Sequence, residues 1–109
     1  FLVAGDIRPG SPTLGRHDSL VVSATNKLQL WAPASFARGF CTQSEFAEVE
    51  YMTTATYNPR AESGIRWNAT AIGIYWPIDD PVLSGKDAAA QSLEEWLARP
   101  EAGHFHYRD

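Results

Sequence analysis

The chain has one cysteine and one methionine among 109 residues, and no apolar run reaches the roughly 18 residues that a membrane-spanning helix needs. A lone Cys41 excludes an intramolecular disulfide and predicts a reducing, cytoplasmic setting. No charged stretch precedes an apolar one, so we predict no signal peptide. Basic residues are also few, nine against 13 acidic ones, which gives a net charge of −4. We therefore expect no general nucleic-acid binding, although a local basic pocket could hold one anionic ligand.

The sequence does contain enough apolar material for one folded domain. Hydrophobic residues make up 44% and charged residues 20%, with four Trp, four Tyr and five Phe. These values predict a single globular domain over residues 1–109. The chain opens directly in the apolar run FLVAGD. A strand at that position needs partners at its edges, so we expect upstream strands to be missing from a truncated chain.

Short apolar runs punctuated by Pro, Gly and Asn predict an all-β fold. The expected strands are residues 1–6, 19–24, 28–31, 40–42, 46–54, 65–67 and 72–76. The only expected helix is SLEEWLARP, residues 92–100, so residues 88–109 form a C-terminal helix and polar tail.

Residues 46–54 show the clearest alternation of side chains with a period of two. One face would carry Ala47, Val49, Tyr51 and Thr53, and the other Phe46, Glu48, Glu50 and Met52. The uncharged face should point inward, which would place Tyr51 in the interior of a barrel. Glu48 and Glu50 would then face solvent or a subunit interface.

Five stretches occur in order and at close spacing: DIRPGSPTLG, LQLWAPASFARGF, AEVEYMTTATYNP, GIRWNATAIGIYWP and LSGKD. Together they resemble the later part of the dTDP-4-dehydrorhamnose 3,5-epimerases, from residue 1 to about residue 87. The resemblance implies a cupin-like jelly roll, here partial, that is a homodimer. It also implies epimerisation of dTDP-4-keto-6-deoxyglucose at C3 and C5 in dTDP-L-rhamnose biosynthesis. The 4-keto group acidifies the neighbouring C–H bonds, so deprotonation to an enolate and reprotonation need no metal or other cofactor.

Three residues match positions of the family's reaction chemistry or diphosphate binding, and each also has a structural interpretation. The resemblance implies that Tyr51 is the acid that returns a proton, whereas the pattern alone also allows a core tyrosine. It implies that Asp87 orients and charges a base histidine, and the alternative is a helix N-cap before AAAQSLEEW. Lys86 matches a substrate-binding lysine suited to a diphosphate, against an ordinary solvated lysine.

Two further positions match nucleotide contacts. Tyr57 matches a tyrosine that stacks on thymine, an interaction worth about 1–3 kcal/mol, and the alternative is a loop tyrosine covering the barrel mouth. Glu62 matches a ligand-contacting glutamate, and the alternative is an exposed loop carboxylate.

The sequence also departs from the family pattern. Arg38 stands in FARGF where the family commonly has a substrate-contacting His, and its fork can bind an oxyanion or phosphate but cannot act as a neutral imidazole. The WND that commonly follows is altered to Trp67-Asn68-Ala69. No stretch matches the family's Arg-Gly-Leu-His type motif that carries the base histidine. The chain alone is therefore not expected to complete the mechanism.

Other function classes stay open on sequence alone. A domain that binds sugar nucleotides without catalysis would keep the fold and lack the base. A metal-dependent cupin would use an H-x-H pair, but His104 and His106 lie in the tail rather than on a strand, and His17 lies in a loop. Asn68-Ala69-Thr70 has the form of a glycosylation sequon, which without a secretory signal indicates little.

Overall fold

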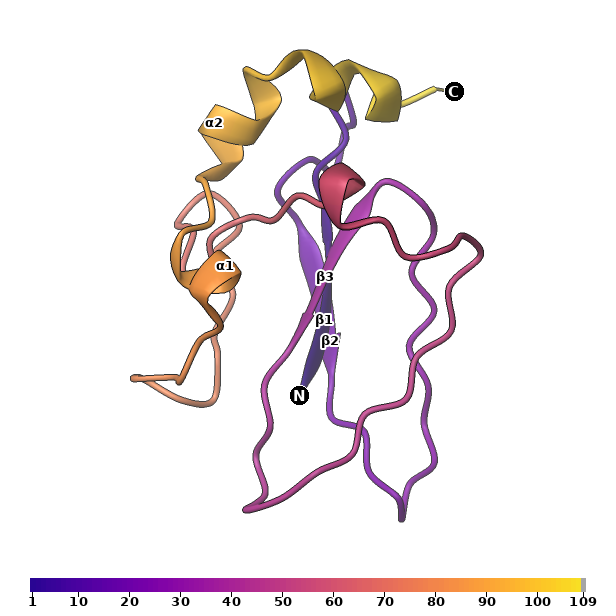
Figure 1. The fold of residues 1–109 in the computed structure, drawn as a ribbon, viewed down its shortest axis with the longest axis vertical. Coiled ribbons are helices and arrows are strands. Elements are labelled where there is room, and N and C mark those ends of the chain that lie inside the picture. The colour runs from indigo at the N-terminus through magenta and orange to yellow at the C-terminus, as the bar shows by residue number, and fades with distance from the viewer. Residues whose placement is uncertain (109) are drawn as a thin grey trace.

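The centre of the molecule is an antiparallel sheet, seen in a computed structural model that describes residues 1–108 (Figure 1). Within these residues the sheet has three strands, β1 (Leu2–Asp6), β2 (His17–Leu20) and β3 (Phe36–Phe40), in the order β2-β1-β3. Leu2 lies opposite Leu20 on one side and Phe40 on the other. The expected first strand is therefore confirmed as the central strand, and both of its edges are paired inside this chain.

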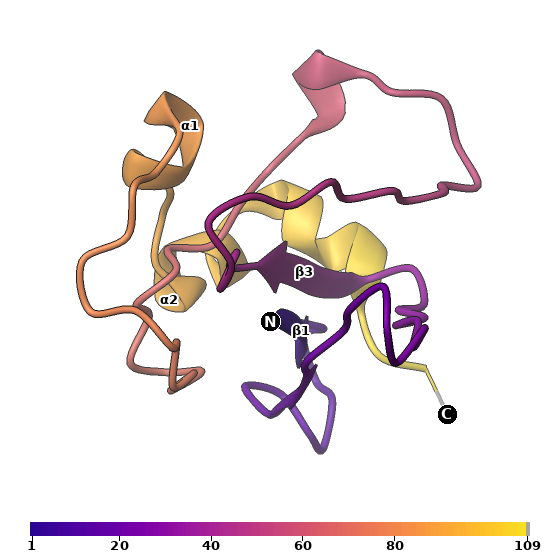
Figure 2. The same cartoon turned by 90° about the horizontal axis from the view of Figure 1, so that it is seen from below.

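Several of the other expected strands are wrong or displaced. The strand expected at 19–24 lies at His17–Leu20, and the one expected at 40–42 lies at Phe36–Phe40. Residues 28–31, 46–54 and 72–76 form no strand, and residues 65–67 contribute only an isolated bridge between Ile65 and Gln91. Residues 46–54, the clearest prediction, instead form part of the irregular segment that leaves β3 and returns at the 3-10 helix η1 (Pro59–Ala61) (Figures 1 and 2).

The reason is that a strand is defined by its hydrogen-bonded partner, whereas alternation reports only which side chains share a face. Residues 46–54 alternate well but pair with no neighbour in the described part of the chain. Their side chains consequently remain exposed, including Phe46, Met52 and Tyr51. The expected interior position of Tyr51 is therefore wrong for this structure, in which its side chain is 80% exposed.

Two short α-helices and a second 3-10 helix follow, rather than the one helix expected. α1 spans Gly85–Ala88, α2 spans Leu93–Leu97 and η2 spans Pro100–Phe105 in the expected polar tail, whose last residue lies outside the described residues. Ser92 caps α2 through a capping box with Glu95. Ser84 caps α1 by accepting a hydrogen bond from the backbone N–H of Asp87. Asp87 is thus not the N-cap that its structural interpretation required, and lies inside α1.

The C-terminal helices form a small apolar core with the segment that precedes them. Leu93, Trp96 and Ala102 are buried, and Ile7, Ile65, Ile72 and Leu97 pack against them. The Phe105 ring lies 5.8 Å from that of Trp96. This packing fixes α2 and η2 across one end of the sheet, as Figure 1 shows for the yellow ribbon at the top.

A polar network completes this end of the molecule. The buried Asp6 carboxylate accepts two hydrogen bonds of 2.9 Å from the Arg8 guanidinium and 2.6 Å bonds from the Ser11 and Thr13 hydroxyls. The bond from Arg8 is the main reason that the pKa of Asp6 lies far below its usual range, and the hydroxyl bonds add to the effect against the cost of burial. The motif DIRPGSPT therefore folds as a turn whose polar side chains hydrogen-bond to one another.

Arg8 also carries this network to the C-terminal segment. Its guanidinium carbon lies 4.6 Å from the centre of the Phe36 ring and 5.0 Å from that of Tyr107. The backbone N–H of Tyr107 donates to the Pro9 carbonyl at 2.9 Å. One side chain thus connects β1, β3 and the end of the described chain.

The segment 65–76 is held against the sheet through Trp76. A Cβ on Gly39 would lie 3.3 Å from the Trp76 ring, so a larger residue on β3 would require the indole to shift slightly. The Trp76 indole N–H donates to the Trp67 carbonyl at 2.6 Å, and its ring meets that of Phe1 edge-on at 5.6 Å. In the described residues, no helix has the length and apolar character needed to cross a membrane.

Candidate functional site

Two of the predicted site residues meet although they are 24 positions apart. Lys86 Nζ donates to Glu62 Oε2 at 3.0 Å, which joins the loop after η1 to the first turn of α1. The pKa of Lys86 is raised, first because Glu62 accepts this hydrogen bond and then because of its negative charge, with smaller electrostatic contributions from Tyr57 and Asp87. The pair therefore keeps Lys86 cationic at an exposed position, where a phosphate oxygen could reach it.

The short helix α1 determines the position of Asp87, the next predicted site residue. Because Ser84 caps the helix, Lys86 and Asp87 follow in a helical turn, and the Ala90 N–H donates to the Asp87 carbonyl at 3.3 Å. The Asp87 side chain is exposed. The Asp87 carboxylate therefore lies in solvent, one residue after Lys86.

The Gln91 side chain is a hydrogen-bonding centre that the sequence analysis missed. Its Nε2 donates to Ser63 Oγ at 2.9 Å and to the Gly64 carbonyl at 3.3 Å, while its Oε1 accepts from Arg99 Nη1 at 3.3 Å. The Gln91 carbonyl also accepts from the Arg66 N–H at 2.7 Å. No motif or spacing marks this residue, because an isolated glutamine in a polar stretch has no signature.

The other predicted residues lie apart from this group. Tyr57 precedes η1 and is 72% exposed. Arg38 lies on β3 opposite Ala4 of β1, with its side chain exposed. Among residues 1–108, no hydrogen bond or ion pair connects Tyr51 or Arg38 to Glu62, Lys86 or Asp87. The structure thus brings together the residues around Lys86, and it does not assemble the Tyr51 acid with them.

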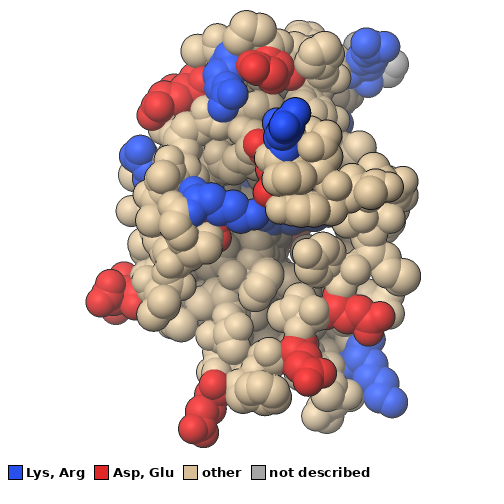
Figure 3. Space-filling model, viewed as in Figure 1, with Lys and Arg blue, Asp and Glu red and all other residues tan. Residues whose placement is uncertain are grey.

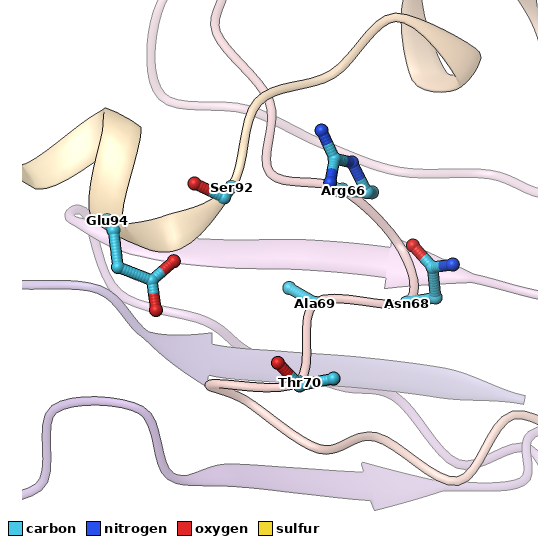
Figure 4. Close-up of a pocket in the computed structure, with 6 residues that line it drawn as sticks. All are labelled: Arg66, Asn68, Ala69, Thr70, Ser92 and Glu94. Carbon is cyan, nitrogen blue, oxygen red and sulfur yellow. The ribbon is translucent and has the colours of Figure 1, made fainter.

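Two hollows lie elsewhere, along the altered stretch Trp67-Asn68-Ala69. A polar cavity of about 280 Å³ lies between this stretch and the start of α2. Figure 4 shows its lining, which is Arg66, Asn68, Ala69, Thr70, Ser92 and Glu94. A second, more open cavity of about 430 Å³ has aromatic walls formed by Trp67, Tyr75 and Trp76. Neither of these two cavities is lined by a predicted site residue.

Charge on the surface is mixed rather than dominated by one sign. On the face seen in Figure 3, basic side chains lie mainly in the upper and middle part, and acidic ones predominate at the lower edge. Such a surface favours binding of one anion by a local group over binding of an extended polyanion. Within the described residues, no three His, Cys, Asp or Glu side chains cluster as metal ligands would. His106 lies against Gly10, and His17 Nδ1 is 3.2 Å from the Ile72 carbonyl oxygen.

Sequence comparison gives a consistent family. The family model described as dTDP-4-dehydrorhamnose 3,5-epimerase matches residues 1–95. A protein of that name from Salmonella typhimurium is 52% identical over 98 residues, which cover 89% of this chain and 54% of that protein. Another, from the archaeon Methanothermobacter thermautotrophicus, is 38% identical and covers 87% of this chain and 53% of that protein. The chain spans about half the length of these relatives.

Structure comparison agrees. A crystal structure of dTDP-6-deoxy-D-glucose-3,5-epimerase from Legionella pneumophila, in complex with dTDP-4-keto-L-rhamnose, matches with a TM-score of 0.79 and 34% identity. The match covers all of this chain and 57% of that one. It confirms the predicted fold class, a partial cupin-like all-β structure, although only three of its strands pair within the described residues.

Proposed function

Because this chain belongs to the dTDP-4-dehydrorhamnose 3,5-epimerase family, we propose that it serves the epimerisation of dTDP-4-keto-6-deoxyglucose at C3 and C5. The observation that carries the proposal is the Lys86–Glu62 pair, which joins the motif LSGKD to the glutamate that matches a ligand contact of the family, at one exposed point. The reaction lies in dTDP-L-rhamnose biosynthesis in the cytoplasm and uses no cofactor.

The residues divide the work as follows. Lys86 neutralises the diphosphate, and Tyr57, from the loop before η1, stacks on the thymine. Asp87 orients the family's base histidine, which removes the proton; no stretch of this sequence matches the motif that carries that histidine. Tyr51 returns a proton to the opposite face of the enolate. Arg38 contacts a substrate oxygen from β3 through its fork.

Completing this site requires Tyr51 to leave its exposed position and meet the residues around Lys86. Residues 46–54 have the alternation of a strand and lack only a partner, so pairing with another strand would turn one of their faces inward. We propose that a homodimer supplies such an edge. The molar mass of the purified chain by light scattering tests this part separately.

The experiment is solvent deuterium incorporation. The protein is incubated with dTDP-4-keto-6-deoxyglucose in D2O, and the C3 and C5 proton signals are followed by NMR. Loss of both signals, abolished in Tyr51→Phe, is expected if the chain holds a complete site. Loss at C3 alone would assign a narrower epimerase, with Arg38 as the first residue to vary.

Binding without exchange would contradict catalysis by this chain alone. It would then act as a sugar-nucleotide-binding domain, and the longer protein form that the relatives have would be the one to assay.

A further inference from the structure

We propose that Gln91 is a positioning residue for nucleotide binding, because its side-chain amide braces the loop of Tyr57 and Glu62 against the helix of Lys86. This inference rests on the proposed function and assigns a role to a residue outside the matched motifs.

The geometry makes the amide a bridge between three segments. Its N–H groups hold Ser63 Oγ and the Gly64 carbonyl, directly after Glu62, and its oxygen takes a hydrogen bond from Arg99 beyond α2. Gln91 itself follows α1, in which Lys86 lies. The main chain reinforces the contact, because the Gln91 carbonyl accepts from Arg66 at 2.7 Å and Ile65 bridges to Gln91.

The Gln91 hydrogen bonds are needed because the Lys86–Glu62 ion pair alone cannot hold the loop after η1 against α1. Lys86 and Glu62 are both solvent-exposed, and an exposed pair of long side chains holds its partners weakly. When a phosphate engages Lys86, that cation is shared between two anions and the pair weakens further. The hydrogen bonds that the Gln91 side-chain amide donates to Ser63 and Gly64 are neutral and do not depend on the ligand. They therefore hold the loop directly after Glu62 in place while the ligand binds.

The test uses two variants that separate the sides of the bridge. Gln91→Met keeps the length of the side chain and removes both donors to the loop. Arg99→Met removes the contact to the oxygen of the amide and the 3.6 Å ion pair with Glu101, but it leaves both donors to the loop in place and is the matched control. Affinity for dTDP is measured by titration calorimetry, and deuterium incorporation is measured against substrate concentration.

Gln91→Met is expected to weaken dTDP about fivefold to tenfold, the range set by losing two neutral hydrogen bonds. It should raise KM by a similar factor, with the rate at saturation changed less than about twofold. Ser63→Ala should give a smaller loss, because the Gly64 carbonyl remains, and it should give no further loss when added to Gln91→Met. Arg99→Met should bind dTDP as the unmodified chain does.

The inference is overturned if Gln91→Met binds dTDP as tightly as the unmodified chain does. It is also overturned if KM is unchanged and only the rate at saturation falls, in proportion to a loss of folded protein. Equal weakening in Arg99→Met would also overturn it. Failure of the proposed function is a different result, because the unmodified chain would then neither bind dTDP nor exchange deuterium. In that case, faster exchange of the Arg66 amide, which donates to the Gln91 carbonyl, would still test the brace in Gln91→Met.

Discussion

The end of the molecule built on Asp6 and the segment between β3 and η1 are made of similarly apolar sequence, yet they fold differently. At the first, β1 is paired on both edges and its last residue, Asp6, is 2% exposed within a set of charged and hydroxyl partners. In the second, residues 46–54 form no hydrogen-bonded β-ladder with any described residue, and Met52 is 86% exposed. The difference shows that apolar alternation becomes a strand only where a partner edge is present, and within the described residues there is none for residues 46–54.

Amide hydrogen exchange tests most directly whether β1 is paired and residues 46–54 are unpaired in solution. Amides of Val3, Ala4 and Gly5 should exchange at least about 100-fold more slowly than those of residues 46–54, because only the former lie in a paired strand. NMR or mass spectrometry at neutral pH gives both sets in one measurement. Slow exchange over residues 46–54 would mean that this segment finds a partner in solution. A dilution series would then distinguish a second copy from a partner within the chain.

The second test removes the anion at the ordered end. Asp6→Ala should lower the free energy of unfolding by about 3–5 kcal/mol, because it leaves the Arg8 guanidinium and two hydroxyls without their shared acceptor. Urea denaturation followed by Trp fluorescence measures the change. Asp6→Asn keeps the shape of the side chain and should cost less. If Asp6→Ala is as stable as the unmodified chain, the network does not hold this end.

A matched pair of apolar truncations compares the two regions directly. Leu93→Ala should cost about 2–4 kcal/mol, because it opens a cavity beside Trp96 and Ala102. Met52→Ala should stay within about 0.5 kcal/mol, because its side chain is already in water. Thermal unfolding of both variants is sufficient. A large cost for Met52→Ala would show that residues 46–54 are packed in solution.

The smallest expected effect is a pH dependence that belongs to one end only. The pKa of Asp6 is lowered in the folded state, so its contribution is complete above the unfolded pKa of about 3.9 and is lost as pH falls toward the folded value. Between pH 6 and pH 3 this should remove about 1 kcal/mol from the unmodified chain. In Asp6→Asn the loss should be smaller by that amount. Parallel pH profiles for the two proteins would contradict the assignment.

Part of the candidate site could be predicted without a structure. The motif LSGKD identified Lys86, and the match to a ligand-contacting glutamate identified Glu62; the two then proved to be in contact. Gln91 could not be found in this way, because its role comes from three partners contributed by different segments. The position of Tyr51 could not be predicted either, because its direction depends on a strand partner.

By itself, the sequence determined the family, a strand at the start and a helix within residues 92–100. The strand and the helix depend on local chemistry, which is an apolar run in the first case and a capping serine in the second. Only the tertiary structure decided which edges of β1 are filled, that Arg8 joins Phe36 to Tyr107, and that the loop of Glu62 meets α1. The physical reason is that these contacts join residues far apart in the chain, and no local pattern encodes which distant group satisfies a given hydrogen bond or charge.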